Sequence, residues 1–140
     1  MSRVFWDTNV FIYFFEDHGQ HGKTARGLRE RMLNRGDQLT TSTMTVGEIL
    51  VKPREAKNLS LCKQYEDAIT ATALVLPFDL AATRIFSVLR TDRSLRAPDA
   101  IQLSCAAAMG TDLFITNDTR LSGLKVPGVQ FIVALDRAPI

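Results

Sequence analysis

The chain has 140 residues, of which 46% are apolar and 23% are charged, and its formal net charge is +2. This composition predicts one globular domain, and no apolar run approaches the roughly 18 residues that a transmembrane helix needs. The two cysteines, Cys62 and Cys105, form no CxxC motif. They are typical of a protein from a reducing compartment, so we expect a cytoplasmic protein.

Short β-favouring runs alternate with helical patterns along the whole chain. Strands are predicted at residues 3–6, 38–42, 73–78, 112–116 and 129–134. Helices are predicted at residues 9–15, 22–34, 45–52, 60–73, 79–92 and 98–109. Pro53 is expected to end the third helix and Pro98 to begin the last. The inward face of helix 79–92 is predicted to consist of Leu80, Ala81, Ile85, Val88 and Leu89.

This alternation predicts a single α/β domain over residues 1–140, with a mostly parallel central sheet flanked by helices. Right-handed crossovers place the carboxyl ends of parallel strands along one edge of the sheet. Open parallel sheets bind their ligands at that edge. Residues that directly follow the strands are therefore the first candidates for a functional site.

Four carboxylates belong to segments that can meet at this edge. Asp7 directly follows the strand RVFW, and Asp118 follows the strand in LFITND. Glu48 lies in the helix after the second strand, and Asp99 lies in the first turn of the helix that begins at Pro98. Two carboxylates about 4 Å apart repel by about 4 kcal/mol at an effective dielectric of 20, so a cluster needs a cation or protons. Oxygen-only ligands favour Mg²⁺ or Mn²⁺ over zinc.

Each of these acids also has a purely structural interpretation. Asp7 suits the N-cap of the helix that follows it. Thr45 and Glu48 fit the S/T-x-x-E capping box. Asp99 suits the positive end of a helix dipole, and Asp118 suits an Asx-turn. These interpretations explain the residues one at a time. They explain less well why two acids directly end apolar strands.

Basic residues flank three of the four acids in the sequence. Positive side chains of this kind hold phosphates by charge and carry little sequence information, and the alternative is an ordinary solvated surface. The candidate phosphate contacts are Lys52, Arg54, Arg93, Arg96 and Arg120. His18 and His21 have no third histidine or cysteine nearby, so we expect no zinc site there.

Four segments together resemble the PIN domain family and, within it, the VapC-type toxins of toxin–antitoxin pairs. These segments are WDTNVFIYF, TVGEILVK, PDAIQLSCAAAMG and DLFITNDTRL. The resemblance spans essentially the whole chain and implies a PIN-like fold and a metal-dependent endoribonuclease. It implies that Asp7, Glu48, Asp99 and Asp118 are the catalytic residues and bind Mg²⁺ or Mn²⁺. Further support of the site is expected from Thr8, Asn9, Thr116 and Asn117.

The same resemblance implies an RNA substrate, a cognate antitoxin and a homodimer, whereas the lack of a long apolar run predicts no membrane association. Two alternatives remain open: a non-catalytic PIN-like module that only binds RNA, and a nuclease directed at DNA. A phosphatase of the haloacid dehalogenase type is disfavoured, because its D-x-D pair would need an acid at Asn9.

Overall fold

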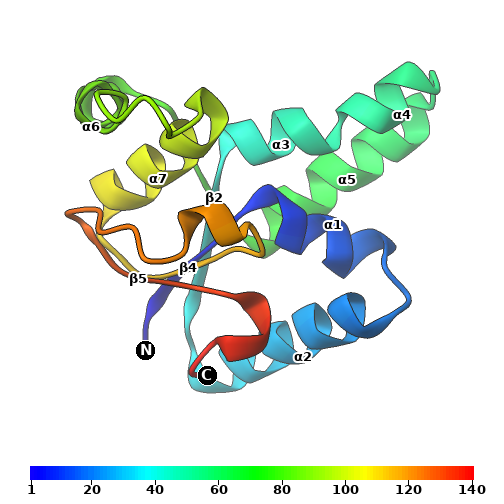
Figure 1. Cartoon of the computed structure of the whole chain (residues 1–140). Helices are drawn as coiled ribbons and strands as arrows, with labels where there is room; N and C mark the ends of the chain where they lie inside the picture. The colour runs from blue at the N-terminus through cyan, green and yellow to red at the C-terminus, as the bar shows by residue number, and fades with distance from the viewer.

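A five-stranded parallel sheet carries helices on both of its faces (Figure 1). This computed structural model describes all residues from 1 to 140. The strands are β1 (Arg3–Trp6), β2 (Gln38–Ser42), β3 (Leu74–Leu76), β4 (Thr111–Ile115) and β5 (Val129–Val133). The helices are α1 (Thr8–Glu16), α2 (Gln20–Arg35), α3 (Thr43–Ile49), α4 (Val51–Glu55), α5 (Leu59–Thr72), α6 (Leu80–Leu89) and α7 (Ala97–Met109). Two short 3₁₀ turns are η1 (Thr119–Leu121) and η2 (Leu135–Arg137).

The strand order β3-β2-β1-β4-β5 places β1 at the centre, and every pairing in the sheet is parallel. Val4 of β1 is in register with Leu39 of β2 and with Leu113 of β4. The predicted α/β fold with a parallel central sheet is therefore confirmed. The carboxyl ends of β1 and β4, neighbours in the sheet, lie side by side although about 110 residues separate them in sequence.

The sheet is buried on both faces by two separate apolar clusters. Val4 and Trp6 point into a cluster built with α1, α2, α3 and α5. Phe5 points to the opposite face, where it joins residues of α6 and α7 and stacks on Phe114 with ring centroids 4.9 Å apart. Side chains alternate between the faces of a strand, so three consecutive residues of β1 serve both cores. No helix of this fold is long and apolar enough to cross a membrane.

The prediction that Pro53 ends the third helix was wrong. The helix α3 already ends at Ile49, and Pro53 lies buried in the short helix α4 that follows. Pro53 is the third residue of α4. An amide there would have no acceptor within its own helix, so proline is tolerated.

The predicted inward face of helix 79–92 was also partly wrong. Leu80 and Val88 are 71% and 68% exposed, whereas Ala82 is buried. The helix begins only at Leu80, because Asp79 caps it by accepting a hydrogen bond of 3.0 Å from the Ala82 amide. The main packing partner of α6 is α7, so a narrow apolar stripe around Ala82 is enough to bury the inner side of α6.

Candidate functional site

The acids that follow β1 and β4 are fixed by the backbone at the carboxyl edge of the sheet. The amide of Asp7 continues the β1–β4 ladder by donating to the Ile115 carbonyl at 3.0 Å. The Asp7 carboxylate also caps α1, accepting from the Thr8 amide at 2.9 Å. Asp118 caps η1 in the same way through the Arg120 amide at 3.0 Å. Both acids therefore have the capping roles that sequence alone permits, and these roles hold them at the edge.

All four candidate acids line one hollow of about 230 Å³ at this edge. The hollow receives Asp7 from the end of β1, Glu48 from α3, Asp99 from the first turn of α7 and Asp118 from the end of β4. Close-packed parallel strands and the two helices beside them bring these segments together. The structure thus groups the four carboxylates that the sequence singled out.

Asp7 is the most deeply buried of the four acids, with 7% of its surface exposed. Burial raises the pKa of Asp7 above 3.8, and the charge of Glu48 adds to this effect. Hydrogen bonds from Thr116, the Thr8 amide and Gln102 act in the opposite direction. The Thr116 hydroxyl donates to Asp7 Oδ2 at 2.8 Å, and Gln102 Nε2 donates to Oδ1 at 3.3 Å.

Glu48 faces the hollow instead of closing its own helix. Its Oε1 accepts a hydrogen bond of 2.6 Å from the Thr8 hydroxyl. The N-cap of α3 is Ser42, whose hydroxyl accepts from the Met44 amide at 3.1 Å. Thr45 lies within the helix, so the capping-box interpretation of Thr45 and Glu48 was wrong.

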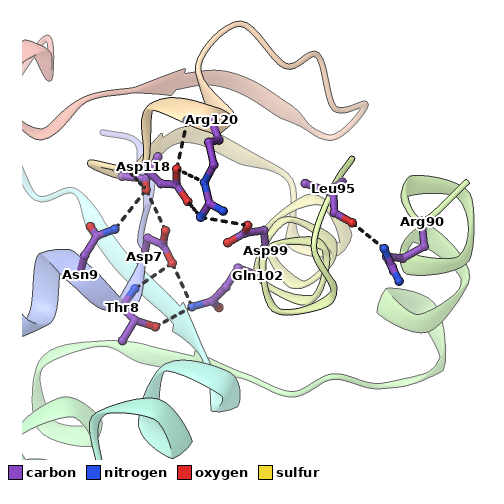
Figure 2. Close-up of polar contacts among 10 residues, drawn as sticks. Asp7, Thr8, Asn9, Arg90, Leu95, Asp99, Gln102, Asp118 and Arg120 are labelled. Carbon is purple, nitrogen blue, oxygen red and sulfur yellow. Dashed lines mark hydrogen bonds and ion pairs between the residues drawn. The ribbon is translucent and has the colours of Figure 1, made fainter. Parts of the chain in front are cut away.

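Arg120 lies between Asp99 and Asp118 (Figure 2). Its Nε donates to Asp118 Oδ1 at 2.8 Å, its Nη2 also contacts Asp118 Oδ2, and Nη2 is 3.8 Å from Asp99 Oδ2. Burial raises the pKa of Asp99 above 3.8, and the charges of Asp118, Asp7 and Glu48 raise it further, whereas Arg96 lowers it. The guanidinium therefore neutralises part of an acidic cluster.

The cluster fits a divalent cation in its chemistry but not in its present arrangement. Its ligand atoms are all oxygens, which suits Mg²⁺ or Mn²⁺. No three His, Cys, Asp or Glu side chains are placed to hold one ion together. The Arg120 guanidinium lies between Asp99 and Asp118, where a metal ion bound to both acids would lie. The three side chains must therefore turn before Asp99 and Asp118 can bind a metal.

Gln102 is a site residue that the sequence analysis missed. It is 2% exposed, and its Nε2 donates to Thr45 Oγ1 at 2.7 Å and to Thr8 Oγ1 at 3.1 Å. Its Oε1 accepts from the Ser42 hydroxyl. The available signal was its spacing: Gln102 lies three residues after Asp99 on the same helix face, among apolar and small residues.

The four predicted supporting residues are also brought together. The Asn9 amide group donates to Thr116 Oγ1 at 3.4 Å, and Asn9 Oδ1 accepts from the Asn117 amide at 3.3 Å. Asn117 Oδ1 in turn accepts from the Leu135 amide at 3.2 Å, which ties η2 to the end of β4. With the contacts of Thr8 to Glu48, these bonds connect α1, α3 and the end of β4 around the acids.

Two of the five candidate phosphate contacts lie beside the acids. Arg96 and Arg120 line a small hollow of about 40 Å³ together with Asp99. Arg93 is exposed in the loop before α7, which Arg90 steadies by donating to the Leu95 carbonyl at 2.6 Å (Figure 2). Lys52 and Arg54 are exposed on α4, which packs on α5 at the outer end of α3, away from α7 (Figure 1).

The sequence matches a known family, and the fold matches known structures. The family model described as the PIN domain matches residues 4–126. The structure is similar to that of VapBC2 from Rickettsia felis bound to a promoter DNA fragment, with a TM-score of 0.75, 15% identity and coverage of 94% of this chain and 97% of that chain. It is similar to DNA-bound VapBC from Salmonella typhimurium, with a TM-score of 0.72, 20% identity and coverage of 96% and 99%.

A toxin–antitoxin complex from Klebsiella pneumoniae gives a TM-score of 0.65 at 22% identity, with coverage of 93% of this chain and 99% of that chain. At these identities the structural likeness shows a shared fold. No curated protein matches the sequence.

Proposed function

The chain belongs to the PIN domain family, and from this premise we propose that it is a Mg²⁺- or Mn²⁺-dependent endoribonuclease. One observation carries the proposal: Asp7, Glu48, Asp99 and Asp118 line the same hollow at the carboxyl edge of a parallel sheet. Repulsion among four clustered carboxylates lowers the stability of a folded domain, whose total free energy of unfolding is only about 5–15 kcal/mol. A bound cation that acts on a phosphate substrate would offset this repulsion and account for the cluster.

The cation would be held by Asp7, Asp99 and Asp118, with Glu48 binding directly or orienting the attacking water. When bound, such an ion activates water and stabilises negative charge on the scissile phosphate. The chain keeps Asp7 in place through Thr116 and Gln102. It keeps Glu48 in place through the Thr8 hydroxyl. We propose that Arg120 pairs with the acids in the free protein and with the phosphate in the substrate complex.

The test is a cleavage assay of the purified protein with mixed RNA in EDTA, Mg²⁺ or Mn²⁺, beside Asp99→Asn prepared identically. We expect discrete cleavage that requires the metal and is lost in the variant. Cleavage that survives Asp99→Asn would overturn the site assignment. Metal-dependent cleavage of single-stranded DNA but not RNA would favour the DNA-directed alternative. RNA binding without cleavage of any RNA would favour the non-catalytic module.

We further propose that the protein is the toxin of a toxin–antitoxin pair and acts in the cytoplasm as a homodimer. The support is the shared fold with proteins that were solved as VapBC or toxin–antitoxin complexes. Induced expression should arrest growth, and co-expression of the neighbouring gene should relieve the arrest. Asp99→Asn is the matched control and should not arrest growth. Light scattering of the purified protein tests the homodimer.

A further inference from the structure

A second and larger hollow adjoins the acidic site. It has a volume of about 640 Å³ and shares Asp118 with the hollow that holds the four acids. The small hollow of Arg96 and Arg120 shares Asp99 with the acidic hollow. The acidic hollow therefore shares a lining residue with each of two other hollows, so a chain-like substrate that crosses the acids can reach both.

The wall of the large hollow carries an aromatic pair. Tyr13 of α1 and His21 of α2 are stacked, with ring centroids 4.6 Å apart and an angle of 23° between the ring planes. Tyr13 is half-buried and packs against the apolar cluster that contains Val4 and Trp6, whereas His21 is exposed. No hydrogen bond within the protein engages the polar atoms of either ring, and the exposed His21 ring is the accessible side of the pair.

The turn between α1 and α2 holds this pair rigidly. Asp17 accepts hydrogen bonds of 2.9 Å from the amides of Gly19 and Gly22, one on each carboxylate oxygen. A Cβ atom at Gly22 would lie 1.8 Å from the Asp17 carbonyl oxygen, so only glycine fits this close approach. The start of α2, and with it His21, is thereby fixed over Tyr13. A preformed flat surface of this kind loses little entropy when a ligand binds.

The charged residues of the large hollow differ from those of the small hollow that contains Arg96 and Arg120. No lysine or arginine lines the large hollow, and the carboxylates in its lining are Asp136 and Asp118, of which Asp118 is paired with Arg120. A phosphate finds no lysine or arginine to bind in this lining, whereas the N–H donors of a neutral base find carboxylate acceptors. Gln20 and Thr24 add an amide and a hydroxyl to the same wall. Arg96 and Arg120, in the small hollow beside Asp99, are better placed to bind a phosphate.

We propose that the large hollow binds one base of single-stranded RNA, next to the scissile phosphate, by stacking on the Tyr13–His21 pair. This proposal rests on the proposed nuclease function and assigns parts of the substrate to two hollows. The large hollow takes the base, and the small hollow of Arg96 and Arg120 takes the backbone phosphate. Unpaired bases stack readily on tyrosine and histidine rings, and each such contact contributes substantially to binding.

The first experiment is an NMR titration of the Asp99→Asn protein in EDTA, observing the ring resonances of Tyr13 and His21. The probes are the four ribonucleoside 5′-monophosphates and, as the control without a base, ribose 5-phosphate. We expect the nucleotides to shift the two sets of ring resonances and ribose 5-phosphate to leave them in place. Equal shifts with ribose 5-phosphate, or no shift with any nucleotide, would overturn the proposal.

The second experiment measures the affinity of a short labelled single-stranded RNA in the same Asp99→Asn background. His21→Ala should weaken binding roughly 5- to 150-fold, as expected for the loss of one stacked base. His21→Phe keeps a flat ring without a charge and should preserve the affinity. The matched control is His18→Ala, because His18 is an exposed histidine of the same turn that does not line the hollow. Equal affinities of the His21→Ala and His18→Ala proteins would overturn the proposal.

These outcomes separate the base site from the nuclease function. Wild-type cleavage that is unaffected by His21→Ala, in rate and in cleavage position, leaves the nuclease standing and rejects the base site. A wild-type protein that never cleaves RNA, but whose rings respond to nucleotides and not to ribose 5-phosphate, rejects the nuclease and supports the base site.

Discussion

The Thr116 hydroxyl donates a 2.8 Å hydrogen bond to Asp7 Oδ2 and thereby joins residues 109 positions apart. Thr116 Oγ1 also accepts from the Asp118 amide at 3.0 Å. One buried hydroxyl therefore links the acid that ends β1 to the turn that carries the acid after β4. This side chain therefore helps to set the relative position of two candidate metal ligands, together with the backbone bond from Asp7 to Ile115.

Replacing this hydroxyl should destabilise the protein and disfavour the ionised form of Asp7. Thr116→Val keeps the shape of the side chain but removes a hydrogen bond to a buried charged group, so we expect a loss of about 1.5–3 kcal/mol. The hydrogen bond from Thr116 lowers the pKa of Asp7, so the variant should raise that pKa further. Denaturant unfolding and NMR titration of the Asp7 carboxyl check both effects. Thr116→Ser keeps the donor and should behave like the wild type.

Asp99→Asn should stabilise the metal-free protein near neutral pH. The raised pKa of Asp99 means that the folded state disfavours the ionised form. The contribution of Asp99 to the stability of the wild type is therefore highest below the ordinary pKa of 3.8 and falls as the pH rises through the raised pKa. The variant should gain almost nothing at about pH 3 and on the order of 1 kcal/mol at about pH 7.

Denaturant unfolding in EDTA at several pH values measures this gain. Asp67→Asn is a suitable control, because Asp67 is exposed and pairs favourably with Lys63 at 2.8 Å. It should not gain stability as the pH rises. A loss of stability in Asp99→Asn at neutral pH would instead favour the helix-dipole role of Asp99.

Arg120→Gln should strengthen metal binding and weaken RNA binding. The guanidinium pairs with Asp118 and lies 3.8 Å from Asp99, so a metal ion must compete with it for these two carboxylates. Calorimetry should show Mn²⁺ binding at least about threefold tighter in the variant. Filter binding of RNA should show the opposite change, because a phosphate contact is lost. Arg93→Gln, in the exposed loop before α7, provides the control and should leave Mn²⁺ affinity unchanged.

Gln102→Ala should lower both stability and cleavage. The amide of Gln102 serves Thr45, Thr8 and Asp7, and its removal leaves buried polar groups without a partner. We expect a loss of about 1–3 kcal/mol in denaturant unfolding. Mn²⁺ binding should persist, because no carboxylate is removed. The exposed glutamine Gln130 on β5 is the control, and Gln130→Ala should change neither stability nor cleavage.

The sequence pattern was sufficient to predict the parallel α/β fold, and the resemblance to the PIN family implied that the four acids form one site. The strand over residues 38–42 was predicted with its observed bounds, and the strand over residues 3–6 likewise. Apolar periodicity is a local property, and the right-handed crossover then fixes which strand ends share an edge. For this reason Asp7 and Asp118, which follow two apolar strands, could be placed together without coordinates.

Only the tertiary structure decided which side chains meet across elements. Gln102 became a site residue because α7 turns that face towards α1 and α3, and Arg120 reached Asp99 because η1 lies beside the first turn of α7. The stacking of His21 on Tyr13 likewise depends on the angle between two helices. Such contacts arise from the way whole helices and strands pack against one another. A sequence pattern of period two or 3.6 shows which side of an element is apolar, but not which residues of another element it will contact.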